Sequence, residues 1–206
     1  MEMVVRDLSV ARGGVRVLEG VTLALRAGQA LLLRGPNGIG KTTLLRTLAG
    51  LQPALGGTVS LPPESTVYAA HADGVKAALS VEENLAFWAA VHRTADLRAA
   101  LRAMGLDDLA TRRAGDLSAG QKRRLGLARL VLTGRPIWLL DEPTVSLDTA
   151  SVALFLDVLR GHLAGGGAAL IATHIDLGLA EASALDLSLF KAQRPAPDPA
   201  FDGAFL

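Results

Sequence analysis

Eight residues near the start of the chain have the types and spacing of a phosphate-binding loop. Residues 35–42 read GPNGIGKT and fit the pattern G-x-x-x-x-G-K-[ST], with a predicted strand before them and a predicted helix after them. Backbone N–H groups of such a loop turn toward a phosphate, and the helix start adds its positive dipole end. A chance match in a glycine-rich turn is the weaker interpretation. The predicted nucleotide-binding residues are Gly35, Pro36, Asn37, Gly38, Ile39, Gly40, Lys41, Thr42 and Thr43.

A pair of acids, Asp141 and Glu142, follows the apolar run 137–140. Open α/β sheets bind ligands at the carboxyl ends of their strands, so these acids should lie near the phosphate-binding loop. Asp141 can hold Mg²⁺ together with the Thr42 hydroxyl, and Glu142 can polarise an attacking water. Lys41 would bring a positive charge to the β- and γ-phosphates of a nucleotide. Two solvated acids at a strand end would be ordinary without that loop.

A third motif, LSAGQ at residues 117–121, precedes the acids and is called the LSAGQ loop below. Ser118 and Gln121 have the S-x-x-Q spacing of a capping box, which predicts a helix start whose N–H groups and dipole face outward. Such a surface suits an anion. A plain helix cap would be the better interpretation if the motif stood alone.

Composition limits the protein classes that the chain can belong to. Its 206 residues fit one domain, or one domain with an inserted lobe. The net charge of +1 gives no electrostatic footprint for nucleic acid, so no nucleic-acid partner is expected. The absence of cysteine excludes disulfides and thiolate metal sites. We expect no secretory signal and no membrane-spanning segment, so that a membrane location would come through a partner.

Hydrophobic patterning predicts the elements that must position these motifs. Strands are expected at residues 3–10, 15–25, 30–34, 58–61, 67–70, 137–141, 168–173 and 185–190, and helices at 41–49, 80–91, 94–104, 118–129, 151–163 and 177–182. A second capping box, formed by Ser80 and Glu83, marks the start of one helix. Alternating strands and helices imply an α/β core with a mainly parallel sheet, interrupted by a helical lobe.

We interpret the chain as a single domain over residues 1–206. Its α/β core is predicted to comprise residues 1–71 and 131–191, with the helical subdomain at 72–130. Residues 192–206 contain Pro195, Pro197 and Pro199, and are expected to form a tail on the surface.

These motifs, in this order and spacing, resemble ATP-binding cassette (ABC) ATPases. The phosphate-binding loop, the LSAGQ loop, the two acids, the run Ser146-Leu147-Asp148 and His174 carry the resemblance, which covers nearly the whole chain. It implies a P-loop NTPase fold of the ABC type, with a mainly parallel sheet, an antiparallel β region and an inserted helical subdomain. It also implies ATP and Mg²⁺ as cofactors, with Lys41, Glu142 and His174 as catalytic residues.

The resemblance further implies a head-to-tail dimer that closes over two ATP molecules. Each ATP would lie between the phosphate-binding loop of one copy and the LSAGQ loop of the other. The residues expected to contact nucleotide across this interface are Ser118, Gly120, Gln121 and Asp148.

Two positions depart from the family pattern. His71 stands where the family usually has a glutamine that contacts Mg²⁺; an imidazole can replace an amide as a hydrogen-bonding group, but its charge depends on pH. Arg12 stands where the family commonly stacks an aromatic side chain on adenine. A guanidinium plane can stack on a base, yet Arg12 could equally be a solvated turn residue.

His71 and the segment 74–88, GVKAALSVEENLAFW, resemble one branch of the family, the ATP-binding subunit of the cytochrome c biogenesis (haem exporter) system. This resemblance implies an integral membrane permease as partner and a peripheral position at the cytoplasmic face of a bacterial inner membrane. ATP would then drive haem export or the release of a haem-loaded chaperone, and both remain open. The alternatives are another ABC importer or lipid exporter, and a soluble ABC ATPase acting on ribosomes or DNA.

Overall fold

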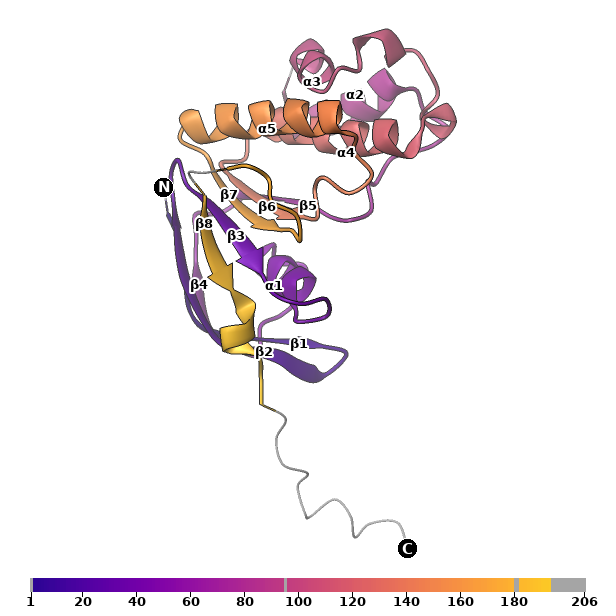
Figure 1. Cartoon of the computed structure of the whole chain (residues 1–206). Coiled ribbons are helices and arrows are strands. Elements are labelled where there is room, and N and C mark those ends of the chain that lie inside the picture. The colour runs from indigo at the N-terminus through magenta and orange to yellow at the C-terminus, as the bar shows by residue number, and fades with distance from the viewer. Residues whose placement is uncertain (1, 95, 180–181, 194–206) are drawn as a thin grey trace, which may run out of the picture.

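The computed structural model describes residues 2–94, 96–179 and 182–193, and these form layers around a central sheet (Figure 1). The helices α2 to α5 lie on one face of that sheet, and α1 lies on the other. A smaller antiparallel sheet packs beyond α1 and shares its apolar core. The predicted α/β fold, with a mainly parallel sheet and an antiparallel β region, is confirmed.

The smaller sheet has the strand order β2-β1-β4, with every pair antiparallel. Its strands are β1 (Glu2–Arg12), β2 (Val15–Arg26) and β4 (Gly56–Ser60). Gly13 and Gly14 join the first two strands with φ of 58° and 82°, a conformation that a two-residue hairpin turn requires at both positions. The hairpin predicted from the sequence is therefore present.

The central sheet has the order β5-β6-β7-β3-β8, and all neighbouring strands are parallel. Its strands are β3 (Ala30–Arg34), β5 (Thr66–Ala69), β6 (Ile137–Asp141), β7 (Ala168–Ala172) and β8 (Ser183–Asp186). Because the strands are parallel, the loops that follow β3, β6 and β7 meet at one edge of the sheet. The residues predicted to bind and hydrolyse a nucleotide follow these strands, so they lie at this edge.

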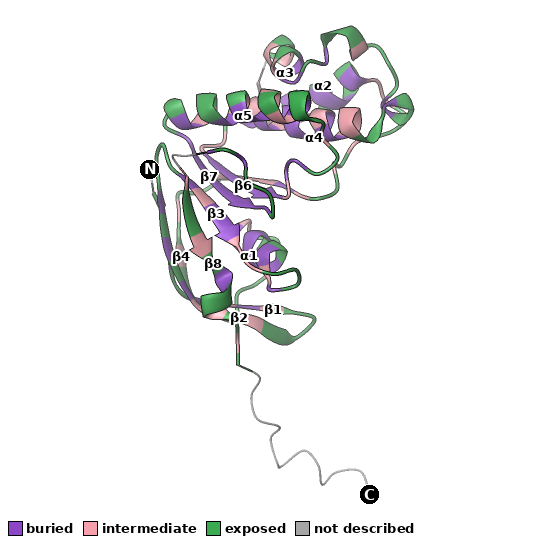
Figure 2. Cartoon of the chain, in the orientation of Figure 1, coloured by how far each residue is buried: buried purple, intermediate pink, exposed green. Residues whose placement is uncertain are grey.

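Strand β6 shows why the sheet must be covered on both faces. All five of its residues are buried. Trp138 and Leu140 pack into the core shared with α2 to α5, while Ile137 and Leu139 pack into the core shared with α1. Figure 2 shows this buried strand between exposed outer surfaces. Alternate side chains of an extended strand point to opposite faces, so one apolar run serves two cores.

The helices are α1 (Lys41–Leu48), α2 (Val81–His92), α3 (Leu97–Ala103), α4 (Ala119–Thr133) and α5 (Thr149–Ala164). Both predicted capping boxes are present, at the starts of α2 and α4. Helix α5 begins two residues earlier than predicted because Asp148 caps it, its Oδ1 accepting from Ser151 N at 2.8 Å. Short 3₁₀ turns, η1 (Asp107–Leu109) and η2 (Ala114–Asp116), connect α3 to α4.

Two predictions near the end of the chain were wrong. Residues 177–179 and 182 form no helix, although Leu177 and Leu179 are buried. Asp176 Oδ1 accepts from Gly178 N at 2.9 Å, a local turn that competes with helix formation. The expected strand at 185–190 stops at Asp186, whose carboxylate caps the 3₁₀ turn η3 (Leu187–Phe190).

The helices α2 and α3 pack on α4 beside the sheet (Figure 1). The residue limits of the helical subdomain stay a prediction, and residues 194–206 of the predicted tail lie outside the described residues. In the described part of the chain, no helix combines the length and the apolar character that crossing a bilayer requires.

Candidate active site

A cavity of about 230 Å³ lies at the edge of the sheet where the loops after β3, β6 and β7 meet. It brings together most of the predicted residues from these loops and from the end of β1, but the predicted Gly35, Pro36 and Ile39 do not line it. The lining residues are Arg12, Asn37, Gly38, Gly40, Lys41, Thr42, Thr43, Asp141, Glu142 and His174. A larger cavity of about 380 Å³ lies at the amino ends of β6 and β7, and neither an acid nor a lysine lines it.

The phosphate-binding loop has a backbone that only glycine adopts easily. Gly35 and Gly40 have φ of 138° and 120°, and a Cβ atom on Gly40 would lie 3.0 Å from Leu18 Cγ. Ile39 is buried in the core and anchors the loop. Helix α1 then begins without a side-chain cap and without an acidic residue in its first turn. Its first N–H groups are thus left for an anion in the cavity.

The charge of Lys41 is held over this loop. Its Nζ atom donates to Gly35 O at 2.8 Å and to Pro36 O at 3.3 Å. Burial lowers the pKa of the Lys41 ammonium, while the negative charges of Glu142 and Asp141 act in the opposite direction. A cation so placed between backbone carbonyls and two acids suits the binding of a polyphosphate.

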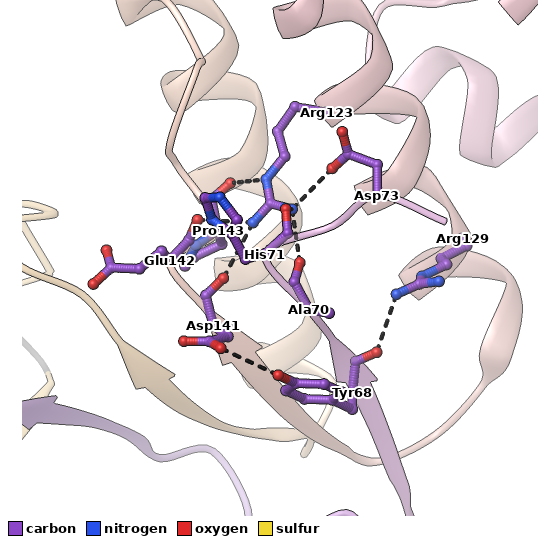
Figure 3. A network of polar contacts seen from close by, with 9 residues as sticks. All are labelled: Tyr68, Ala70, His71, Asp73, Arg123, Arg129, Asp141, Glu142 and Pro143. Atoms are coloured by element: carbon purple, nitrogen blue, oxygen red, sulfur yellow. Dashed lines mark hydrogen bonds and ion pairs between the residues drawn. The ribbon is translucent and has the colours of Figure 1, made fainter. Parts of the chain in front are cut away.

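Asp141 is almost completely buried and receives a hydrogen bond that the sequence did not suggest. The Tyr68 hydroxyl, from the neighbouring strand β5, donates to Asp141 Oδ2 at 3.1 Å (Figure 3). Burial raises the pKa of Tyr68, and the Asp141 charge raises it further. Tyr68 therefore stays protonated and fixes one carboxylate oxygen of Asp141.

Glu142 occupies a strained position at the wall of the cavity. Its φ is 47°, in the left-handed region, and its N–H donates to Ala172 O at 2.9 Å. Its buried Oε1 atom lies 3.0 Å from His174 Nε2, but the pair lacks hydrogen-bond geometry. Among the described residues nothing donates to this oxygen. It is placed to accept a hydrogen bond from a water in the cavity.

His174 lies in a turn whose backbone is hydrogen-bonded to Arg34. Arg34 Nη1, at the end of β3, donates to Thr173 O at 3.2 Å and to Ile175 O at 2.9 Å. These carbonyl groups flank His174 on both sides. Arg34 thus ties the His174 turn to the strand that leads into the phosphate-binding loop, a role that sequence reasoning missed.

The residues of the LSAGQ loop do not line the cavity. Ser118 Oγ accepts from Gln121 N at 3.2 Å, and Gln121 Oε1 accepts from Ser118 N at 2.9 Å. A Cβ atom on Gly120 would lie 2.9 Å from Ser146 O, so this glycine lets the LSAGQ loop approach the loop after Glu142 closely. Asp148 is exposed at the start of α5, and the hydrogen bonds from Ser151 lower the pKa of its carboxyl.

His71 is exposed and is not among the residues that line the cavity. Its carbonyl oxygen accepts a hydrogen bond from Arg123 at 3.3 Å (Figure 3). The described structure therefore connects the backbone of His71, rather than its imidazole, to the acids.

The family model described as ABC transporter matches residues 18–145, a stretch that includes the phosphate-binding loop, the LSAGQ loop and both acids. The chain belongs to the ABC transporter family. Membership makes it an ATP-binding protein and an ATPase, as the resemblance of its motifs implied.

The chain is also similar to curated members of one branch of this family. It is 66% identical to the Cytochrome c biogenesis ATP-binding export protein CcmA of Rhodobacter capsulatus, with 99% of each chain covered. It is 62% identical to the protein of the same name from Paracoccus denitrificans, with 98% of each covered. The predicted resemblance to the cytochrome c biogenesis branch of the ABC transporter family is confirmed.

A solved structure supports the assignment to the ABC transporter family. An ABC transporter ATP-binding protein from Pyrococcus furiosus superposes with a TM-score of 0.83 at 28% identity, covering 93% of this chain and all of the other.

Proposed function

We propose that this ABC transporter family member is the ATP-hydrolysing subunit of a membrane complex that serves cytochrome c biogenesis. The observation that carries the proposal is the 66% identity to a cytochrome c biogenesis ATP-binding export protein over almost the full length of both chains. The cavity that unites the phosphate-binding loop, Asp141, Glu142 and His174 supports hydrolysis as the chemical step.

Residues 35–43 bind the phosphates of ATP through backbone N–H groups and the Lys41 ammonium. Thr42 and Asp141 hold Mg²⁺, a hard cation that prefers such oxygen ligands. Tyr68 leaves one oxygen of the Asp141 carboxylate for this purpose. Arg12 lines the cavity, where its guanidinium plane can stack on the adenine base. A metal role for the His71 imidazole stays a prediction.

Glu142 accepts a hydrogen bond from the attacking water and orients it toward the γ-phosphate. His174, 3.0 Å from Glu142, keeps that carboxylate aligned and contacts the γ-phosphate. Lys41 stabilises the negative charge that spreads over the phosphate oxygens in the transition state. All three residues line one cavity, which supports their joint action.

The active site is completed by a second copy of the chain. Ser118, Gly120, Gln121 and Asp148 lie outside the cavity, and we assign them to the ATP held by the partner. The capping box of α4 occupies the N–H groups of Ser118 and Gln121, so that those of Ala119 and Gly120 remain for the partner's γ-phosphate. The dimer is head-to-tail.

The proposed complex contains an integral membrane permease of the cytochrome c maturation system. The chain binds it from the cytoplasmic face of the bacterial inner membrane. The names of the relatives, which describe ATP-binding export proteins of cytochrome c biogenesis, support this placement. Hydrolysis drives haem export or the release of a haem-loaded chaperone.

The test replaces the chromosomal gene by one that encodes Glu142→Gln. We expect haem-stained c-type cytochromes to be lost while b-type cytochromes persist, and the tagged chain to co-purify from membranes with the permease. Normal c-type cytochromes, or recovery of an amino-acid or lipid permease instead, would contradict the proposal. In the variant, a haem-loaded chaperone that accumulates at the membrane would indicate that ATP serves its release.

A further inference from the structure

The buried guanidinium of Arg123 lies where three segments of the chain meet (Figure 3). Arg123 belongs to α4, two residues beyond the LSAGQ loop. The other segments are the loop after β5, residues 70–73, and the end of β6 with the turn that follows it, residues 141–143. Its side chain is only 4% exposed, and no residue of the phosphate-binding loop is among its hydrogen-bond partners in the described structure.

On one side Arg123 binds three consecutive carbonyl groups. Nε donates to Pro143 O at 2.9 Å, and Nη2 donates to Glu142 O at 2.7 Å and to Asp141 O at 3.3 Å. In an extended strand, successive carbonyls point in opposite directions; here the chain turns at Glu142, where φ is 47°. The guanidinium therefore stabilises the backbone conformation that places the Glu142 carboxylate in the cavity.

On the other side Arg123 binds the loop after β5. Nη1 donates to Ala70 O at 2.8 Å, to His71 O at 3.3 Å and to Asp73 Oδ1 at 2.9 Å. The Asp73 carboxylate balances the buried charge. Gly126, one turn along α4, permits this contact, because a Cβ atom there would lie 2.9 Å from Asp73 Cβ.

We propose that Arg123 is a positioning residue for ATP hydrolysis, which holds the Glu142 backbone in its catalytic conformation and ties it to the His71 loop. This inference rests on the proposed role of Glu142. Arg123 touches neither the nucleotide cavity nor the phosphate-binding loop. It acts on the placement of Glu142 and leaves the binding of ATP to other residues.

Arginine suits this position because one guanidinium donates to all six acceptors. A guanidinium presents five N–H donors in a fixed planar fork, whereas a lysine ammonium has three donors on a flexible stem. Arg123→Lys keeps the charge opposite Asp73 and loses the fork. A displacement of the catalytic group by about 1 Å can lower the rate about a hundredfold.

The matched control is Arg124→Lys. Arg124, the next residue of α4, donates to Met104 O at 2.7 Å and to Gly105 O at 2.8 Å, and so holds carbonyl groups inside the helical lobe. The two variants make the same substitution on the same helix. They differ in the carbonyl groups that lose a hydrogen bond: those of residues 142 and 143 for Arg123→Lys, and those of residues 104 and 105 for Arg124→Lys.

The experiment measures ATP hydrolysis, binding of a fluorescent ATP analogue and amide hydrogen exchange on the full-length chain, purified with its membrane partner. For Arg123→Lys we expect kcat to fall by about ten- to a hundredfold while nucleotide affinity changes less than about threefold. Exchange should rise together in residues 70–73 and 141–145. Arg124→Lys should keep kcat within about twofold and loosen residues 104–105 instead.

If Arg123→Lys unfolds the chain, Asp73→Asn keeps the side-chain shape and removes only the charge opposite Arg123. It should lower kcat in the same direction, without loss of nucleotide affinity. An unchanged kcat, a parallel loss of nucleotide affinity, or unchanged exchange at 141–145 would overturn the inference. Wild-type hydrolysis tests the proposed function separately: if the wild-type complex hydrolyses no ATP, that function fails, and the exchange pattern still decides the role of Arg123.

Discussion

The chain contains two nearly identical capping boxes, of which only one is proposed to contact ATP. At α2, Ser80 Oγ accepts from Glu83 N at 3.1 Å; at α4, Ser118 Oγ accepts from Gln121 N at 3.2 Å. The reciprocal bonds are 2.7 and 2.9 Å. Ser80→Ala and Ser118→Ala therefore remove the same local interaction. Any difference between the two variants must come from something beyond helix stability.

The magnitudes follow from this geometry. Loss of a serine N-cap costs about 1 kcal/mol, which lowers Tm by about 2–4 °C for a chain of 206 residues, and both variants should show this shift. Ser118→Ala also removes a hydroxyl proposed to bind the partner's γ-phosphate. A hydrogen bond to a charged group contributes about 1.5–3 kcal/mol, or about ten- to 150-fold in rate.

The assay compares Tm, ATP binding and kcat/KM for the two variants. We expect equal Tm shifts, unchanged ATP binding by each single subunit, and a loss of hydrolysis for Ser118→Ala alone. Equal losses of hydrolysis would show that helix stability, and not contact with ATP, explains the LSAGQ loop. Loss of ATP binding in Ser118→Ala would refute the assignment of this serine to the partner's nucleotide.

Three further predictions test other parts of the site. Glu142→Gln should bind ATP without hydrolysing it and accumulate as a dimer on size-exclusion chromatography; a variant that stays monomeric at saturating ATP would contradict the shared site. The pKa of Tyr68 is raised on folding, so the folded state keeps its proton after the unfolded state begins to lose it near pH 10, and stability should fall as pH rises above that value. Tyr68 is the only tyrosine, so its tyrosinate absorbance should appear only as the protein unfolds, and an earlier appearance would argue against the hydrogen bond to Asp141. Arg34→Lys should lower kcat about tenfold with little change in ATP affinity, because it frees the turn that carries His174; equal loss of both would place Arg34 in nucleotide binding instead.

The features that sequence reasoning predicted well are those encoded within one segment. The phosphate-binding loop, the two capping boxes and the apolar strand β6 each depend on residues a few positions apart. Their patterns are set by local backbone geometry, so one sequence suffices to read them. The order of strands and helices along the chain was then enough to predict the parallel sheet and the inserted helices.

The side chains that were missed act between distant segments. Tyr68 lies 73 positions from Asp141, and Arg34 lies 139 positions from Thr173. Arg34 and Arg123 bind mainly backbone carbonyls, and every residue type provides a carbonyl. Their partners therefore leave no trace in the sequence. Residues 177–179, where a helix was expected, are not helical for a local reason, since the Asp176 turn outweighs an apolar spacing that is typical of a helix.

The segment from Glu142 to Asp148 connects the cavity to the LSAGQ loop. Glu142 and Ser146 both adopt left-handed backbone conformations, with φ of 47° and 67°, at a cost of about 1–3 kcal/mol each. Glu142 lines the cavity of its own chain, while Ser146 O lies against Gly120 of the LSAGQ loop. Since Arg123 fixes the first residues of this segment from α4, the LSAGQ loop and Glu142 are held by one helix. In the proposed dimer, α4 therefore links the LSAGQ loop, which would meet the partner's ATP, to the backbone of Glu142, so that closure of the dimer and placement of this carboxylate would be coupled.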